Sequence, residues 1–173
     1  MKLRVSPPPP PRRRYKLVAF AFAALFLVSG CASVQMAPPE ESMKAKEFNP
    51  PAQGNAGVYI FRNTSRAIFL KKDIWIDGEC IGESAPNVFF YTQVAGGKTY
   101  QIETESLFSS NTLDVTLESG KNYFIQQLIV TVDLAIVGLL GVAELEQVSE
   151  EEGKELVTWL EMAKPGNCSA PPR

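Results

Sequence analysis

The chain of 173 residues contains no histidine and only three cysteines. A histidine-dependent catalytic triad, a zinc site with histidine ligands and a cysteine-rich metal site are therefore excluded. Acidic residues are missing from the first 30 positions, which carry six Lys or Arg, so the remainder has 11 basic and 19 acidic residues and a net charge of −8. That charge disfavours nucleic acid as a partner.

Long apolar runs are scarce, and the first of them indicates a signal peptide. Residues Leu17 to Val28 form an uncharged run of twelve behind a basic segment. As a helix the run spans about 18 Å, less than the roughly 30 Å hydrocarbon core of a bilayer. This layout is typical of a secretory signal peptide, and a single membrane anchor is the alternative. Arg12-Arg13-Arg14 also suggests twin-arginine export, but its flanking residues fit a generic basic segment better.

The apolar run ends in a motif with a cysteine. The residues Val28, Ser29, Gly30 and Cys31 resemble the lipobox of bacterial lipoproteins. The resemblance implies that the Cys31 thiol is acylated and that residues 1–30 are removed as a signal peptide. Because the next residue is Ala32, it also implies sorting to the outer membrane, with the folded part facing the periplasm. We therefore expect membrane lipid to be one partner, through acylated Cys31.

A flexible tether is expected to follow over residues 31–55. This segment is rich in Pro, Glu, Lys and small residues, a composition typical of a linker. As a flexible coil it would reach about 25–30 Å, enough to hold a domain off the lipid surface.

From Gly57 onward, turn residues recur about every eight to twelve residues, with β-branched and aromatic residues between them. This spacing predicts a mainly β fold, an antiparallel β-sandwich over residues 56–164. Asp77-Gly78 predicts a tight hairpin because glycine tolerates positive φ. Strong alternation of apolar and polar residues marks two of the strands. The expected strands are 58–61, 73–76, 88–93, 98–105, 113–118 and 123–130.

A short C-terminal helix is expected after Ser149. Ser149 and Glu152 have the spacing of a capping box. Leu156, Trp159 and Leu160 then provide one apolar stripe for the sheet. Gly153 disfavours helix, so a turn at 151–153 followed by a strand at 155–159 is the alternative. Residues 165–173 are expected to form a tail.

The apolar segment Leu128 to Ala143 is too short for a membrane span and contains Asp133. We expect the end of one strand, an apolar connection around Gly138 and Gly141, and the start of another strand. The alternatives for the connection are full burial and partial exposure of residues 135–140, where they would touch lipid or a partner.

The order of motifs from Gly57 to Leu156 resembles the lipoprotein family known as domain of unknown function 2846. Its central part, 76–103, is also similar to a PEGA module, in which a second hairpin forms here at Gly96-Gly97. Both resemblances imply a β-sandwich and neither implies an activity. The motifs that carry them are Gly57-Val58-Tyr59-Ile60-Phe61-Arg62, Ile76-Asp77-Gly78, Ile81-Gly82-Glu83, Phe89-Phe90-Tyr91, Gly120-Lys121-Asn122-Tyr123-Phe124 and Glu151-Glu152-Gly153.

Two thiols are left beside Cys31. Cys80 and Cys168 would lie in an oxidising compartment, and we expect an intramolecular disulfide between them. Two free thiols or an intermolecular bridge are the alternatives. Closing a loop of about 88 residues would stabilise the fold by roughly 4–4.5 kcal/mol.

No enzyme is expected, because the sequence shows no nucleophile motif. Asp77 is interpreted as a turn residue, and Glu103, Glu105, Asp114 and Glu118 as acids on solvated strand faces. We expect no cofactor and no metal. The predicted function is a binding or structural role in the cell envelope, with an envelope protein as partner. The alternative is a small-ligand or glycan-binding module that uses an aromatic surface at Phe89, Phe90 and Tyr91.

Overall fold

The computed structural model of the protein describes residues 33–64, 69–106, 111–131 and 141–169. The chain divides into two compact units, Met1–Cys31 and Ala32–Arg173, and every described residue belongs to the second. The predicted signal peptide and Cys31 thus lie outside the described residues. The elements in chain order are α2 (Pro39–Ala45), β1 (Asn55–Arg62), β2 (Lys72–Ile76), β3 (Glu79–Ser84), β4 (Val88–Ala95), β5 (Lys98–Thr104), β6 (Asn111–Leu117), β7 (Asn122–Thr131), β8 (Gly141–Val148), α3 (Glu150–Thr158) and β9 (Glu161–Met162).

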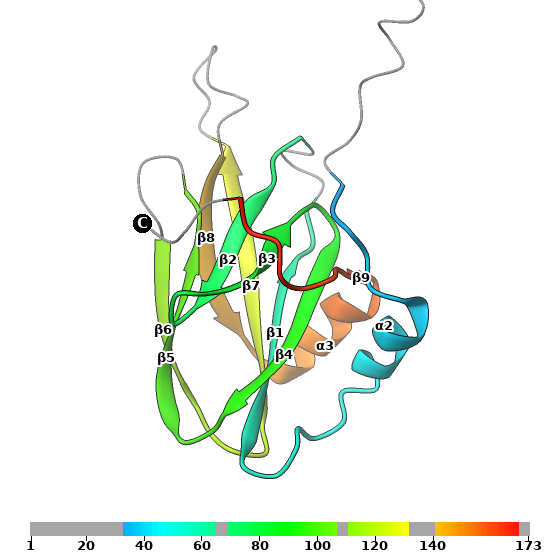
Figure 1. The fold of residues 1–173 in the computed structure, drawn as a ribbon, viewed down its shortest axis with the longest axis vertical. Coiled ribbons are helices and arrows are strands. Elements are labelled where there is room, and N and C mark those ends of the chain that lie inside the picture. The colour runs from blue at the N-terminus through cyan, green and yellow to red at the C-terminus, as the bar shows by residue number, and fades with distance from the viewer. Residues whose placement is uncertain (1–32, 65–68, 107–110, 132–140, 170–173) are drawn as a thin grey trace, which may run out of the picture. The chain divides into compact units, whose positions relative to one another are not determined.

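The strands form two packed sheets (Figure 1). The five-stranded sheet has the order β8-β7-β1-β4-β9, and the four-stranded sheet has the order β3-β2-β5-β6. Most neighbours are antiparallel, but β1 pairs in parallel with β7, and β4 with β9. The predicted β-sandwich with a short C-terminal helix is confirmed. The two parallel pairs are an addition that the turn spacing did not indicate.

Alternate residues of β1 enter two different hydrophobic cores. Val58 and Ile60 belong to the core between the sheets, whereas Tyr59 and Phe61 belong to a second core. This second core also contains residues of α2 and α3, which lie beside the five-stranded sheet in Figure 1. Because both faces of β1 are covered, the strand is buried along almost its whole length.

The predicted hairpin at Asp77-Gly78 joins β2 to β3. Both residues have positive φ, 48° and 78°, as a type I′ turn requires at its two central positions. The Asp77 carboxylate accepts a hydrogen bond of 2.9 Å from the backbone N–H of Gln101 on β5. Asp77 is thus a structural residue, but it ties the turn to a neighbouring strand instead of to its own backbone.

The second hairpin expected at Gly96-Gly97 is wrong. These residues connect β4 in one sheet to β5 in the other. The Gly96 N–H donates to the Gly54 carbonyl at 2.8 Å, and the Gly97 N–H donates to the Leu117 carbonyl at 2.6 Å. The chain therefore crosses between the sheets here. Gly96 is bonded to the residue before β1 of the five-stranded sheet, and Gly97 to the last residue of β6 in the four-stranded sheet.

The flexible tether expected over residues 31–55 is wrong for its described part, residues 33–55. Pro39 begins α2 at a position where its missing N–H costs nothing. Ser42 and Ala45 of this helix are buried, and the Ser42 hydroxyl donates to the Glu161 carboxylate at 3.1 Å. Further on, the Phe48 ring lies 5.5 Å from the Tyr59 ring. The segment has a linker's composition, yet it packs through a few small and aromatic side chains.

The C-terminal helix α3 confirms the predicted cap and overturns the alternative strand at 155–159. The Ser149 hydroxyl accepts a hydrogen bond of 3.2 Å from the Glu152 N–H. The apolar stripe differs from the expected one, because Val157 is buried whereas Trp159 is 83% exposed. The buried residues are Gly153, Val157 and Leu160, which are spaced by four and by three and so share one face. Trp159 lies off that face at the C-terminal cap.

Strands β7 and β8 form the expected pair on either side of an apolar connection. They are antiparallel from Phe124 opposite Val148 to Thr131 opposite Gly141. The connection, 132–140, lies outside the described residues. The two alternatives for residues 135–140, burial and partial exposure, therefore stay predictions. Among the residues that the structure describes, no helix is both long and apolar enough to span a membrane.

Candidate functional site

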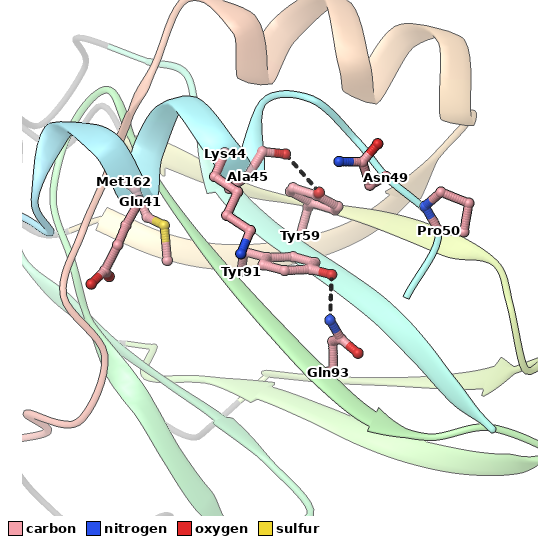
Figure 2. A pocket seen from close by; sticks show the side chains of 9 residues that line it. All are labelled: Glu41, Lys44, Ala45, Asn49, Pro50, Tyr59, Tyr91, Gln93 and Met162. Atoms are coloured by element: carbon pink, nitrogen blue, oxygen red, sulfur yellow. Dashed lines mark hydrogen bonds between the residues drawn. The ribbon is translucent and has the colours of Figure 1, made fainter. Parts of the chain in front are cut away.

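A pocket of about 350 Å³ lies where α2 and the loop after it meet β1 and β4 (Figure 2). The helix and loop contribute one wall, and the two strands contribute the floor. The pocket is lined by Glu41, Lys44, Ala45, Asn49, Pro50, Tyr59, Tyr91, Gln93 and Met162. Five of the nine residues belong to the segment 31–55 that the sequence predicts to be a flexible tether, so the sequence pattern did not indicate this pocket.

Two tyrosines form the floor of the pocket. Tyr59 of β1 lies directly opposite Tyr91 of β4 in the sheet register, and their ring centroids are 4.5 Å apart. Tyr59 is buried, and its hydroxyl donates to the Ala45 carbonyl at 2.8 Å. Burial, with a smaller contribution from Tyr91, raises the pKa of Tyr59 well above its usual range. Tyr59 therefore stays a neutral donor, and the partly exposed Tyr91 ring is the aromatic face open to the pocket.

Gln93 fixes the polar edge of the pocket. Its amide nitrogen donates to the Tyr91 hydroxyl at 3.0 Å, and its amide oxygen accepts from the Ala52 N–H at 2.8 Å. These two bonds hold Tyr91 in one orientation and tie the loop after α2 to β4. The floor is thus preorganised before any ligand arrives.

The opposite side of the pocket carries charge. Glu41 and Lys44 come from one face of α2 and line the pocket together. Figure 2 shows the Lys44 side chain extending from the helix toward the level of the Tyr91 ring. An aromatic face, an amide and two opposite charges are groups that stack on and hydrogen-bond to a small polar ligand. Within the described ranges, no group of three or more Cys, Asp or Glu could hold a metal ion.

The aromatic surface predicted at Phe89, Phe90 and Tyr91 is wrong for two of its three members. Phe89 lies in the core under the helices and Phe90 in the core between the sheets, and both are fully buried. The reason is that both faces of β4 are covered at its start, so successive aromatic side chains on opposite faces are both buried, each in a different core. Tyr91 alone reaches a pocket. Its partner Tyr59 could not be assigned to the site without the register of β1 on β4.

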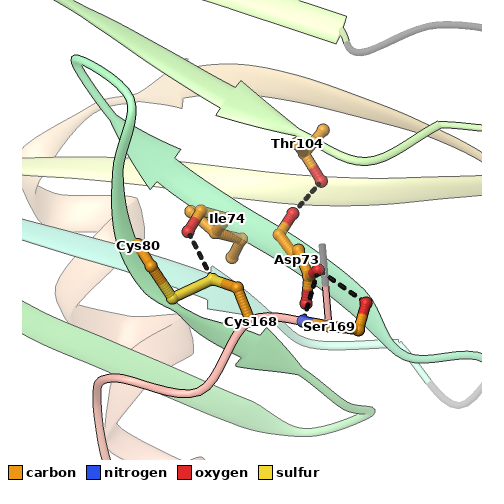
Figure 3. The surroundings of a disulfide bond; sticks show 6 residues. All are labelled: Asp73, Ile74, Cys80, Thr104, Cys168 and Ser169. Carbon is orange, nitrogen blue, oxygen red and sulfur yellow. Dashed lines mark hydrogen bonds between the residues drawn. A yellow bond between two sulfur atoms is a disulfide. The ribbon is translucent and has the colours of Figure 1, made fainter. Parts of the chain in front are cut away.

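The expected disulfide is confirmed. Cys80 at the start of β3 is bonded to Cys168, with Cα atoms 6.0 Å apart (Figure 3). Beside it, the Asp73 carboxylate accepts two hydrogen bonds from Ser169, from the N–H at 2.8 Å and the hydroxyl at 2.7 Å. The C-terminal segment, which the sequence predicts to be a tail from residue 165, is therefore fixed to β2 and β3 up to Ser169.

A buried polar chain joins the two sheets. Gln127 of β7 is fully buried; it accepts from the Ser84 hydroxyl at 2.5 Å and donates to the Thr104 hydroxyl at 2.6 Å. The Thr104 hydroxyl in turn donates to the Asp73 carbonyl at 3.2 Å. Because each hydroxyl in this series of hydrogen bonds has a partner, the hydrogen bonds offset the free-energy cost of burying these polar groups. The bonds from Gln127 to Ser84 and Thr104 cross from the five-stranded to the four-stranded sheet.

One acid expected on a solvated face is not solvated. Glu103 is 9% exposed and lies opposite Trp75 of β2, which is also buried. Asp114 and Glu118 are exposed as expected. The alternation along β5 fails at Glu103 because Trp75 and its neighbours cover that part of the outer face.

The fold and site define a β-sandwich with one helix-covered face and a pocket at the helix edge. The chain belongs to the family described as Protein of unknown function (DUF2846), which matches residues 52–141. It is 50% identical over 137 residues to an uncharacterized protein of Haemophilus influenzae, a match that covers 79% of this chain and 78% of the relative. No solved structure matches the chain.

Proposed function

We propose that the protein is a bacterial lipoprotein, anchored through acylated Cys31 to the outer membrane and facing the periplasm, where its β-sandwich binds an envelope protein. The observation that carries the anchor is the motif Val28-Ser29-Gly30-Cys31 directly after the apolar run. Multiple acyl chains, each contributing about 0.8 kcal/mol per buried methylene, make such an anchor durable. Ala32 after the cysteine supports sorting to the outer membrane.

A protein partner is supported by Trp159. Its side chain is 83% exposed at the C-terminal cap of α3. An exposed tryptophan on a rigid element is typical of residues that contribute most of the binding energy in protein interfaces. Met43 on α2 is also an exposed large apolar residue, at 64%.

The anchor is tested by intact mass and membrane fractionation of the chain expressed with its own N-terminus. We expect loss of residues 1–30, added acyl mass and sedimentation with the outer membrane. Cys31→Ala should lose all three, whereas the matched control Ser29→Ala, which keeps a small residue before the cleavage position, should retain them. An uncleaved chain in the inner membrane would contradict the proposal.

The partner is tested by photo-crosslinking in intact cells. A photoreactive amino acid at position 159 should trap a discrete protein adduct, which mass spectrometry then identifies. The matched control is the same amino acid at Thr116, an exposed position on the four-stranded sheet. Equal labelling at both positions, or none at 159, would argue against a partner surface at Trp159.

The pocket supports a second candidate function, binding of a small polar ligand such as a glycan. The observation in its favour is the Tyr91 ring, held in place by Gln93 at the pocket wall. Oligomers of N-acetylglucosamine are a suitable probe, because they offer hydroxyl and amide groups and an apolar sugar face. Titration followed by NMR should shift pocket resonances in the native protein and not in Tyr91→Ala, with Gln101→Ala as the control. Shifts of equal size in Tyr91→Ala would exclude this pocket.

A further inference from the structure

Several strand ends meet at one end of the sandwich. β1 ends there at Arg62, opposite Val88 at the start of β4. β7 runs parallel to β1 and continues to Thr131, opposite Gly141 at the start of β8. We call this the Arg62 end; in Figure 1 it is uppermost, where the arrowhead of β7 lies.

The described chain also begins at the Arg62 end. Val34 packs against the core between the sheets, and the Gln35 carbonyl accepts a hydrogen bond of 2.7 Å from the Lys164 N–H. Ser33 lines a depression of about 220 Å³ together with Lys71, the residue before β2. The start of the folded unit is therefore fixed in place from Val34 onward.

The connection from this fixed point to Cys31 is short. Val34 is three residues after Cys31, and three extended residues span at most about 11 Å. The headgroup region of one leaflet is about 5–7 Å thick beyond the hydrocarbon core. If the acyl chains of Cys31 lie in the hydrocarbon, most of the connection of about 11 Å is used to cross the headgroup region. Val34 then lies at most about 5 Å beyond the headgroups.

The described side chains at the Arg62 end suit a lipid surface. Phe69 is 56% exposed and lies two residues before Lys71, and Val130 is 46% exposed near the end of β7. The Lys71 ammonium forms an ion pair of 3.0 Å with Glu83, so its charge is compensated. Exposed apolar side chains favour the bilayer interface because they bury apolar area among the headgroups.

We propose that the Arg62 end is a membrane-contact surface, which rests on the headgroups of the phospholipid bilayer that holds Cys31 and inserts Phe69 at the interface. This inference rests on the proposed acylation of Cys31. The occupant is lipid because the short connection brings a bilayer to this surface whether or not any protein partner is present.

The test is fluorescence quenching by brominated phospholipids. The full acylated protein is reconstituted in vesicles of phosphatidylethanolamine and phosphatidylglycerol, with and without brominated acyl chains. Trp159→Phe serves as the background, since Trp75 is only 2% exposed and gives a constant signal. Phe69→Trp is the reporter. The matched control is Glu79→Trp, an exposed position beside the hairpin turn at the opposite end of β2.

Intact mass first determines whether the purified chain carries acyl groups. On an acylated chain, brominated lipid should lower the emission of the Phe69→Trp reporter about twofold, because interfacial side chains lie about 5–10 Å deep. The Glu79→Trp emission should not change. No quenching at residue 69, or equal quenching at both positions, overturns the membrane-contact surface alone. A chain without acyl mass overturns the anchor as well.

A spacer variant tests the role of the short connection. An insertion of about 20 Gly and Ser residues between Ala32 and Ser33 reaches about 25 Å as a flexible coil. In the acylated Phe69→Trp reporter this insertion should reduce quenching toward the level of Glu79→Trp. Quenching that is unchanged by the insertion overturns the proposal that the short connection holds this end on the bilayer.

Discussion

Gly153 of α3 lies directly on the Phe124 ring of β7, so close that a Cβ at residue 153 would be 2.2 Å from Phe124 Cγ. Gly153→Ala should therefore destabilise the protein by about 1–3 kcal/mol, although alanine is the better helix former by about 1 kcal/mol. The ring is buried in the second core, and its centroid is 4.8 Å from that of the Tyr59 ring on which it stacks. Urea unfolding of the detergent-solubilised protein measures the change.

The control for this prediction is Glu155→Ala, an exposed change on the same helix. It should alter the free energy of unfolding by no more than about 0.5 kcal/mol. If Gly153→Ala were more stable than the native protein, the close packing of α3 on β7 would be contradicted.

Loss of the disulfide should lower stability strongly. The bond closes a loop with a sequence separation of 88, and the chain-entropy account gives about 4.5 kcal/mol as the upper value for Cys80→Ala/Cys168→Ala. Adding a reductant should bring the native unfolding midpoint down to that of the double variant and leave the variant unchanged. A native midpoint that does not respond to reductant would show that the bond contributes little.

Gln127→Leu should cost about 1–3 kcal/mol, because it leaves the buried Ser84 and Thr104 hydroxyls without this partner. Gln126→Leu, the same change on the opposite face of β7, is the control and should cost less. Ser84→Ala and Thr104→Val added to Gln127→Leu should recover part of the loss, since the polar groups that need a partner are then gone. If the triple variant instead lost as much stability as the sum of the separate substitutions, the coupling of these three side chains by hydrogen bonds would be contradicted.

The ion pair between Lys46 and Glu161 should make stability depend on pH. The hydrogen bond from Lys46, with a smaller contribution from Ser42, holds the pKa of Glu161 below its usual value. A carboxyl group with a lowered pKa in the folded state stabilises the protein above its unfolded pKa of about 4.3, and this contribution is lost as pH falls further. Glu161→Gln should lower stability at pH 7 by less than about 1 kcal/mol, because the Glu161 side chain is 67% exposed and solvent screens the pair.

The measurement compares unfolding midpoints of the native protein and Glu161→Gln at pH 7 and pH 3. The difference should shrink as pH falls toward 3, because Glu161 progressively loses the charge that glutamine lacks at this position. A difference that persists at pH 3 would assign the effect to the Ser42 hydrogen bond instead of to charge.

The strands and the disulfide could be predicted from sequence because their signals are local or few. The apolar Tyr100 and Ile102 alternate with the polar Gln101, which predicts a strand with one covered face. Asp77-Gly78 predicts a tight turn from two adjacent residues alone. Cys80 and Cys168 are the two cysteines beside Cys31, so only one intramolecular pairing exists between them. The similarity of 76–103 to a PEGA unit, in contrast, stays a prediction.

The pocket could not be predicted because it depends on contacts between distant segments. Tyr59 meets Tyr91 only through the register of β1 on β4, and Lys44 reaches them only because α2 docks. The composition of residues 31–55 resembles that of a linker, and no local pattern reports the docking. Phe89 and Phe90 look like a surface in sequence because a strand covered on both faces loses the alternation that distinguishes inside from outside.

Because α2 docks on the sheet, the unit that folds is larger than the region that the family shares. The family match covers 52–141, whereas α2 lies before it and α3 and Cys168 lie after it. A fragment trimmed to that region would lose the cover over Tyr59 and Phe124 and leave Cys80 as a free thiol. Such a fragment should aggregate through its uncovered aromatic sheet face, so recombinant work on relatives of this chain has to retain both flanking segments.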